Sequence, residues 1–305
     1  MRNNGVIVTG GAGFVGSHLA YKRAKADFRV TVLDNLSSGK KKNIVSKIKF
    51  YKADVKNPQI LNIFKKEKPG AVFHYAAQID ARKSTQEPVE NARVNILGAL
   101  NILECCKKTG VQKFIFSSSA GVYGESKHLP VKESHPQNPI SPYSATKLAV
   151  EKYLNYYESQ GVGCVALRYS NIYGPRQTSG GGVIAVLINK ILGGKRPVVY
   201  GKGDQTRDFL YVNDAVSAAV KSLKAKSGSI YNVGTDSEIS VKKLIEKISR
   251  ELNVKIKPIF APANPEEILR SRIDFSRIKK ELGWRPKYDF QEGLKETISY
   301  FRNEN

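Results

Sequence analysis

The chain has 305 residues, 41% of them hydrophobic and 25% charged, a composition that supports a sizeable core and excludes a disordered or low-complexity protein. Lys and Arg number 50 against 27 Asp and Glu, which gives a formal net charge of +23. Such a charge attracts polyanions. The basic residues are nevertheless dispersed along the chain, and their longest cluster is Lys40–Lys42, without an arginine-rich tail or interleaved aromatic residues. We therefore do not expect nucleic acid as a specific partner.

The sequence carries no signal for a membrane. No stretch approaches the ~18 uninterrupted apolar residues of a transmembrane helix, and the first apolar run, Val6–Val8, is too short for a signal peptide. Cys105, Cys106 and Cys164 lack metal-ligand spacing and indicate small buried thiols in a reducing compartment. We expect a cytoplasmic protein with no bound metal and no membrane partner.

Short β-branched runs alternate with amphipathic stretches in the first half of the chain. The predicted strands lie at 6–9, 30–34, 48–51, 71–74, 113–117 and 163–168, and the predicted helices near 15–24, 59–66, 89–108 and 143–160. Alternation with short connections is typical of a parallel sheet covered by helices on both faces. The sequence therefore predicts an α/β fold with a Rossmann-like, doubly wound parallel sheet over residues 1–173.

The pattern changes after about residue 171. The glycines 180–182 and the turn-rich segment 193–197 break the alternation. Shorter predicted strands at 198–200, 208–212 and 230–233 then mix with helices near 240–252, 276–282 and 290–300. We predict a smaller α+β substrate-binding region over residues 174–305, with some segments returning to the sheet.

A glycine-rich turn follows the first predicted strand and opens the first helix. Gly10, Gly13 and Gly16 let a backbone turn approach a pyrophosphate, whose charge the helix N-terminus would hold. Asp34 ends the second strand, 18 residues after Gly16, where a carboxylate can bind an adenosine ribose. A carboxylate there repels a 2′-phosphate, so the pattern favours NAD over NADP, although Lys40–Lys42 could soften that preference. The alternative is a glycine-rich turn beside an ordinary surface aspartate.

A serine, a tyrosine and a lysine form a second pattern. Ser119 ends the fifth predicted strand region, and Tyr143 and Lys147 lie four residues apart at the start of a long helix, on one face. A nearby ammonium favours the phenolate, so we expect Lys147 to lower the pKa of Tyr143 from its usual value of about 10. Tyr143 could then take a proton from a sugar hydroxyl while a hydride leaves the same carbon for a nicotinamide.

With these residues in place, the chain resembles the extended short-chain dehydrogenases/reductases, and within them the nucleotide-sugar epimerases of the UDP-glucose 4-epimerase type. The resemblance runs from about residue 5 to residue 286. It rests on the segments 10–16, 33–39, 53–55, 74–78, 94–98, 117–124, 141–143, 167–177 and 205–209.

The resemblance implies roles for individual residues. Ser119, Tyr143 and Lys147 would be catalytic, with Ser119 on the sugar 4-hydroxyl and Tyr143 as base and then acid. The implied NAD-binding residues are Gly10, Gly13, Phe14, Val15, Gly16, Asp34, Asn35, Ser38, Gly39, Asp54, Val55, Ala76, Ala77, Gln78, Asn95, Tyr143, Lys147 and Tyr169. The implied substrate-binding residues are Ser119, Tyr143, Asn171, Val183, Val198, Tyr200, Arg207 and Ser271, with Asn171 and Arg207 on the diphosphate.

Two positions help to separate epimerases from related enzymes. Related dehydratases and the UDP-xylose-forming decarboxylase carry carboxylates after the strand-end serine or threonine, whereas this chain has Ala120 and Gly121. Elimination needs an acid and a base there, so these residues favour epimerisation.

Ser271 lies near a gate that is bulky in strict glucose/galactose epimerases, and its small side chain would leave space for a 2-acetamido group.

One position departs from the family. Asn264 stands where an arginine usually pairs with the substrate phosphate, and Arg207, Arg270 or Arg272 could supply the missing charge.

The resulting prediction is NAD-dependent C4 epimerisation of a UDP-hexose, UDP-glucose/UDP-galactose or their N-acetylated forms, through a 4-keto intermediate. The resemblance also implies a homodimer formed by the helices near 89–108 and 143–160. One alternative is a nucleotide-sugar reductase or dehydrogenase of the same superfamily, which would release NAD(H) in each cycle. Another, motivated by the +23 charge, is a nucleic-acid-binding protein on a dehydrogenase scaffold.

Overall fold

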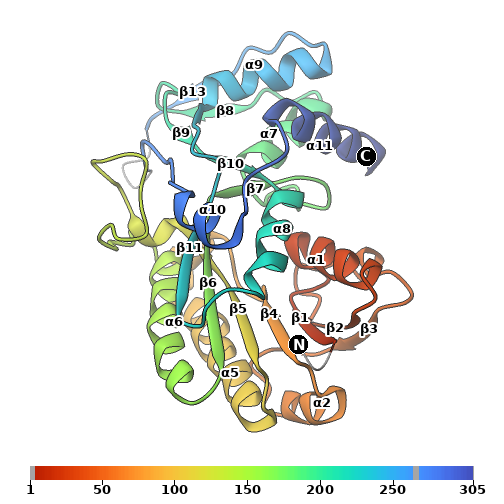
Figure 1. Cartoon of the computed structure of the whole chain (residues 1–305). Helices are drawn as coiled ribbons and strands as arrows, with labels where there is room; N and C mark the ends of the chain where they lie inside the picture. Colours follow the sequence, from red (N-terminus) through yellow and green to blue (C-terminus); the bar gives the residue numbers. More distant parts are fainter. Residues whose placement is uncertain (1–3, 264–267, 305) are drawn as a thin grey trace.

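A parallel sheet forms the centre of the molecule (Figure 1). The computed structural model describes residues 4–263 and 268–304. Within these ranges the seven strands of this sheet follow the order β11-β6-β5-β4-β1-β2-β3, and every neighbouring pair is parallel. The strands are β1 (Gly5–Thr9), β2 (Arg29–Asp34), β3 (Lys49–Lys52), β4 (Ala71–His74), β5 (Lys113–Ser119), β6 (Gly163–Tyr169) and β11 (Ser229–Val233). The predicted α/β fold with a doubly wound sheet is confirmed.

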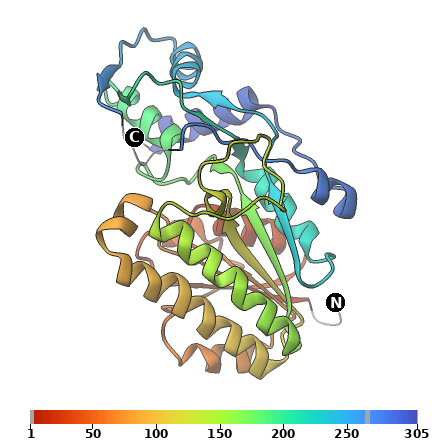
Figure 2. The same ribbon diagram turned by 90° about the vertical axis from the view of Figure 1, so that its left-hand side faces the viewer.

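Helices cover both faces of the sheet (Figure 2). On one face, α2 (Ile60–Glu67), α5 (Gly98–Thr109) and α6 (Pro142–Ser159) pack on β-strand side chains in one apolar cluster. On the other, α1 (Phe14–Lys25) and α8 (Val212–Ser222) contribute to a second cluster that continues into the C-terminal region. Because both faces of the sheet centre are buried, the central strands β1 and β4 are largely continuous apolar runs, whereas the edge strand β3 has lysines at both ends and is partly exposed.

The helix predicted near 89–108 is interrupted. The structure instead has α3 (Ala81–Gln86), α4 (Pro88–Ala92), a π-helical turn η2 (Arg93–Leu97), and then α5. Asp80 caps α3 by accepting the amides of Arg82 at 2.9 Å and Lys83 at 3.1 Å. Single π-helical turns often occur at functional sites, and this one places buried Asn95 behind the site described below.

The rest of the chain builds the smaller region above the sheet (Figure 1). Its two-stranded pairs are β10 with β7, β12 with β9, and β13 with β8. These elements are β7 (Asn171–Tyr173), α7 (Val183–Leu192), β8 (Val198–Tyr200), β9 (Thr206–Arg207), β10 (Phe209–Tyr211), β12 (Ile239–Ser240), α9 (Val241–Leu252), β13 (Ile259–Ala261), α10 (Ser276–Leu282) and α11 (Phe290–Glu304). Two short 3₁₀ turns, η1 (Lys41–Asn43) and η3 (Ala120–Tyr123), follow β2 and β5.

The strand predicted at 230–233 is β11, which returns from the second region to pair with β6 and completes the main sheet. Two details differ from the predicted elements. The strand predicted at 208–212 is shorter, because Val212 already begins α8. Helix α7 was not predicted, since its run of apolar residues lacks the polar face that marks an amphipathic helix.

None of the helices in the described ranges combines the length and hydropathy that a bilayer crossing requires.

Candidate active site

Two adjoining pockets lie where the sheet strands end. Their cavity volumes are about 340 and 170 Å³, and both are lined by Ser119, Tyr169, Ser170 and Asn171, which makes them one continuous site. Ligands of open α/β sheets bind at this edge. Of the residues predicted from sequence, the first pocket is lined by Gly10, Gly13, Phe14, Val15, Gly16, Asp34, Asn35, Ser38, Asp54, Val55, Ala76, Ala77, Ser119, Tyr143, Lys147, Tyr169, Asn171 and Val183. Arg207 and Ser271 line the second pocket.

The three glycines of the turn differ in what a side chain at each position would contact. Gly10 has φ +67°, and a Cβ there would lie 2.6 Å from the amide nitrogen of Ala76. A Cβ on Gly16 would collide with the Gly10 carbonyl, so the chain's own packing requires both residues. At Gly13, a Cβ would meet only the Gly10 oxygen, at 3.2 Å. Gly13 caps α1 without a side-chain hydrogen bond, which leaves the helix N-terminus suited to a pyrophosphate.

The end of the pocket near β2 fits an adenosine ribose. Asp34 is 8% exposed, and its carboxylate accepts the amides of Ala12 at 2.9 Å and Leu36 at 2.8 Å, which fixes its orientation. Asn35 donates to Asp54 at 3.1 Å beside it. The Asp34 carboxylate at this end is of the kind that suits ribose hydroxyls and disfavours an added phosphate.

Three predicted cofactor residues do not line the pocket but support it. A Cβ on Gly39 would lie 2.9 Å from the Asp34 carboxylate, so this glycine lets the loop pass behind that acid. Asn95 accepts the amide of Gln78 at 2.8 Å and donates to the Gln78 carbonyl at 3.0 Å and to Thr146 at 3.1 Å. Asn95 therefore ties the segment after β4 to α6, which carries Tyr143 and Lys147, the two residues of this helix predicted to be catalytic.

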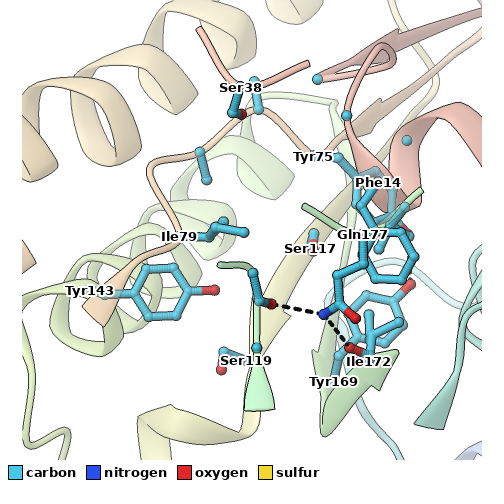
Figure 3. A pocket seen from close by; sticks show the side chains of 18 of the residues that line it. Phe14, Ser38, Tyr75, Ile79, Ser117, Ser119, Tyr143, Tyr169, Ile172 and Gln177 are labelled. Carbon is cyan, nitrogen blue, oxygen red and sulfur yellow. Dashed lines mark hydrogen bonds between the residues drawn. The ribbon is translucent and has the colours of Figure 1, made fainter. Parts of the chain in front are cut away.

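Tyr143, Lys147 and Ser119 converge as predicted. Helix α6 begins at Pro142 after Ser141, whose hydroxyl accepts the Ser144 amide at 3.2 Å. Figure 3 shows the Tyr143 hydroxyl pointing from α6 into the pocket, on the side where Ser119 ends β5. Lys147 is 3% exposed and donates to the Ser117 carbonyl at 2.7 Å.

The expected lowering of the Tyr143 pKa is wrong for this state of the site. Burial raises the pKa of Tyr143 to about 12, although a hydrogen bond with Ser119 opposes that shift. Burial also lowers the pKa of Lys147 to about 7, opposed by the charge of Glu151. The ammonium donates to the Ser117 carbonyl at 2.7 Å and lies 5.7 Å from the Tyr143 ring centre.

A buried ion pair behind Ser119 was missed from sequence. Glu151 and Arg168 are each 3% exposed, and their side chains meet at 2.6 Å. Ser118 donates to Glu151 at 2.5 Å, and Arg168 donates to the Tyr123 hydroxyl at 2.8 Å. The available signal was weak: Glu151 lies four residues after Lys147 on the same helix.

Gln177, across the cavity from Tyr143, was also not singled out from sequence (Figure 3). Its amide nitrogen donates to the carbonyls of Ile172 at 3.2 Å and Gly181 at 2.8 Å. These bonds fix the wall formed by the loop before α7.

The second pocket is built by the smaller region and η3. Arg207 on β9, Arg270 and Ser271 line it, together with Asn171. Two predicted substrate residues, Val198 and Tyr200, lie on β8 and line neither pocket; Tyr200 is 40% exposed and faces Arg82 at 5.5 Å. The departure noted at position 264 lies outside the described residues.

The chain is similar to nucleotide-sugar enzymes over almost its whole length. A sequence model of the family described as GDP-mannose 4,6 dehydratase matches residues 7–297. A UDP-glucose 4-epimerase of Mycolicibacterium smegmatis is 37% identical over 98% of this chain and 99% of its own. A dTDP-D-glucose 4,6-dehydratase of Homo sapiens is 33% identical over 97% of this chain and 89% of its own.

Solved structures of epimerases superpose closely on this fold. The Thermotoga maritima UDP-glucose 4-epimerase with UDP-glucose has a TM-score of 0.96 and 38% identity, covering 98% of this chain and 99% of that one. The Thermus thermophilus UDP-glucose 4-epimerase in complex with NAD has a TM-score of 0.93 and 36% identity, covering 99% and 100%. The NAD prediction is thus confirmed at the level of the family. The chain belongs to the family described as GDP-mannose 4,6 dehydratase, among the NAD-dependent extended short-chain dehydrogenases/reductases that include nucleotide-sugar epimerases and dehydratases.

Proposed function

We propose that the protein catalyses the NAD-dependent C4 epimerisation of a UDP-hexose through a 4-keto intermediate. The observation that carries this proposal is the distribution of carboxylates. Among the described residues that line the two pockets, Asp34 and Asp54 are the only acids, and both lie at the end that suits the adenosine. The positions after Ser119 are Ala120 and Gly121. Elimination of water needs a further acid and base near the sugar, so this site supports epimerisation over dehydration.

The three catalytic residues have separate tasks in this proposal. The Ser119 hydroxyl holds the sugar 4-oxygen, and Tyr143 takes the proton from that oxygen and later returns it. Bound NAD supplies the acceptor and donor of a hydride at C4. Lys147, held by the Ser117 carbonyl, places a positive charge near the developing phenolate and can anchor a ribose hydroxyl.

The mechanism sets the sequence of proton and hydride steps. Loss of the hydroxyl proton to Tyr143 and loss of hydride from C4 convert the alcohol to a ketone. The ketone must then turn in the pocket, so that hydride returns to the opposite face and Tyr143 reprotonates the oxygen. A roomy sugar site beside a firmly held cofactor is therefore required, and the second pocket beside Ser119 supports this arrangement.

Either UDP-glucose and UDP-galactose or their N-acetylated forms are the proposed substrates. Ser271 lines the second pocket, and its small side chain supports acceptance of a 2-acetamido group. Turnover of UDP-glucose without turnover of UDP-N-acetylglucosamine would count against this part of the proposal.

The test is incubation of the purified protein with UDP-glucose, UDP-N-acetylglucosamine or UDP-glucuronate, with no added cofactor, followed by chromatographic separation of the products. A 4-epimer supports the proposal and shows that NAD is retained through the cycle. A nucleotide-sugar reductase would instead need a stoichiometric supply of NAD(H). Absence of product even with added NAD would contradict epimerisation of these three substrates.

We also propose a homodimer through the helices near 89–108 and 143–160, which are α4, η2 and α5 on one side and α6 on the other. Leu97, Tyr153 and Tyr156 on this side of the molecule are 58%, 44% and 53% exposed, an unusual share for large apolar side chains. Light scattering after size-exclusion chromatography tests this: a dimer mass in wild type and a monomer mass in Leu97→Glu/Tyr156→Glu are expected, whereas a wild-type monomer contradicts it.

A further inference from the structure

Helix α6 carries a third ionisable residue on the face of Tyr143 and Lys147. Glu151 follows Lys147 by four residues, as Lys147 follows Tyr143, so the three side chains lie on one face of the helix. Lys147 and Glu151 are both buried. Tyr143 and Lys147 line the first pocket and have tasks in the proposed reaction, whereas Glu151 lines neither pocket.

The end of β5 joins Lys147 to Glu151. The Lys147 ammonium donates to the Ser117 carbonyl at 2.7 Å, and the next residue, Ser118, donates its hydroxyl to Glu151 at 2.5 Å. Two successive residues of one strand thus bind two successive turns of α6, and Ser119 follows them directly. Because the ammonium and the carboxylate are anchored in the interior, little water screens the attraction between their charges.

Glu151 balances the charges of two buried cations, Lys147 and Arg168. Arg168 lies opposite Ser118 in the sheet and binds both Glu151 oxygens, at 3.0 Å from its Nε and 2.6 Å from a terminal nitrogen. A guanidinium keeps its charge in proteins, whereas a buried lysine can lose its proton. If the negative charge of Glu151 were lost, Lys147 is therefore the cation that could relieve the imbalance, by releasing a proton.

Other titratable groups around this pair do not replace the charge of Glu151. His74 on β4 is neutral near pH 7, since burial, and then the charge of Lys147, lower its pKa to about 3. Tyr143 is also neutral there, because burial raises its pKa to about 12. Glu133 contacts Arg168 through its backbone carbonyl, at 3.3 Å, and the two aspartates of the first pocket lie at the adenosine end.

We propose that Glu151 is a positioning residue, which keeps the Lys147 ammonium protonated beside Tyr143 by balancing the charges of Lys147 and Arg168. The inference rests on the proposed function, in which that ammonium stabilises the developing phenolate. Burial lowers the pKa of Lys147 to about 7 even against the opposing charge of Glu151, so without that charge the ammonium would be lost near neutral pH. Arg168 acts in the opposite direction, since it takes up part of the charge of Glu151.

The experiment follows the titration of Lys147 itself, by NMR of protein labelled with carbon-13 at the lysine Cε, and the signal absent from Lys147→Arg belongs to Lys147. Glu151→Gln should lower the titration midpoint by about 1 pH unit or more, the usual effect of removing a neighbouring opposite charge. Arg168→Met should raise the midpoint. The matched control is Glu104→Gln, which removes a carboxylate that accepts the Tyr157 hydroxyl of α6 at 2.9 Å, about 15 Å along the helix from Lys147. It should leave the midpoint unchanged.

The opposite signs separate this role from a structural one, because Glu151→Gln and Arg168→Met both break the same buried pair and both should destabilise the fold. Glu151→Asp retains the charge and should restore most of the wild-type titration. The pH profile of kcat with UDP-glucose should follow the midpoint, so kcat of Glu151→Gln should fall at a lower pH than in wild type, with KM unchanged.

An unchanged Lys147 midpoint in Glu151→Gln, or midpoints that move in the same direction in Glu151→Gln and Arg168→Met, would overturn the inference. If circular dichroism shows that Glu151→Gln does not fold, a midpoint that fails to rise in Arg168→Met overturns it alone. Midpoints that move as expected in a protein that forms no 4-epimer would contradict the proposed function and support the charge balance.

Discussion

The buried ion pair behind Ser119, the serine proposed to be catalytic, gives the sharpest prediction about stability. Glu151 and Arg168 are almost fully buried and meet at 2.6 Å. Replacing Arg168 by Met removes one partner and leaves the Glu151 carboxylate in the interior with one remaining side-chain donor, Ser118. Breaking a buried pair in this way costs about 3–5 kcal/mol of unfolding free energy. We expect Arg168→Met to lose stability in that range.

A double-mutant cycle separates the part of this stability loss that comes from the unpaired charge from the part that comes from lost packing. Arg168→Met combined with Glu151→Leu removes both charges of this pair, whereas the buried Lys147 stays and loses the opposing charge of Glu151. Replacing a buried pair by apolar groups is often near neutral. In the double variant the hydroxyls of Ser118 and Tyr123 still lose these hydrogen-bond partners, and each loss costs about 1–3 kcal/mol of unfolding free energy.

Urea unfolding followed by circular dichroism measures each corner of the cycle, with unchanged m-values as the check on two-state behaviour. The expected result is a double variant more stable than the sum of the two single losses by about 2 kcal/mol or more. Strictly additive losses would refute the reasoning, because they would mean that neither charge depends on the other.

Three further predictions concern the site and its support. Tyr143→Phe should lower kcat about 10²- to 10⁴-fold with UDP affinity unchanged, because it removes only the proton-carrying hydroxyl. The control is Tyr21→Phe on α1, a 36% exposed tyrosine that lines neither pocket. An active Tyr143→Phe would exclude Tyr143 as the base. Gly16→Ala should unfold or markedly destabilise the protein, because its Cβ would collide with the Gly10 carbonyl, whereas Gly13→Ala should stay folded and lose bound NAD. The absorbance of NAD released by denaturation measures the NAD content. Equal NAD content in Gly13→Ala and wild type would contradict the proposed position of the pyrophosphate. Burial lowers the pKa of His74 to about 3, so as the pH falls the unfolded chain binds a proton at His74 before the folded chain does. The free energy of unfolding should therefore fall as the pH drops below about 6.5, by up to about 1.4 kcal/mol per pH unit. Urea unfolding at several pH values measures this slope, which His74→Gln should reduce.

The dinucleotide half of the site could be predicted because its signals are local in sequence. The glycine turn, the acid at the end of β2, and the Tyr143–Lys147 spacing each lie within one strand–turn–helix unit. The strands could be located for a similar reason, since burial on both faces makes each one a continuous apolar run. Local patterns therefore suffice where one backbone element carries the whole arrangement.

The remaining features depend on contacts between distant segments. The pair of Glu151 with Arg168 joins α6 to β6, and the pair of Arg270 with Glu238 joins segments 32 residues apart. The roles of Gln78 and Asn95 as a support rather than a lining follow from a π-helical turn, which periodicity does not reveal. The prediction of a lowered Tyr143 pKa was wrong because spacing on a helix does not show how deeply the phenol is buried, and burial is the main cause of the raised pKa.

The two sides of the site hold their polar groups in different ways, and this difference matches the proposed reaction. On the cofactor side, Asp34 accepts two backbone amides and Asn95 bonds the backbone on both sides of Gln78, so these groups are fixed before a ligand arrives. On the substrate side, the Arg270 side chain is 56% exposed and pairs with the partly buried Glu238, an arrangement of low energetic cost to exchange. An epimerase must keep NAD through oxidation and reduction while the sugar nucleotide enters, turns and leaves. Rigid polar anchors on one side and exchangeable charges on the other meet both requirements within one continuous site.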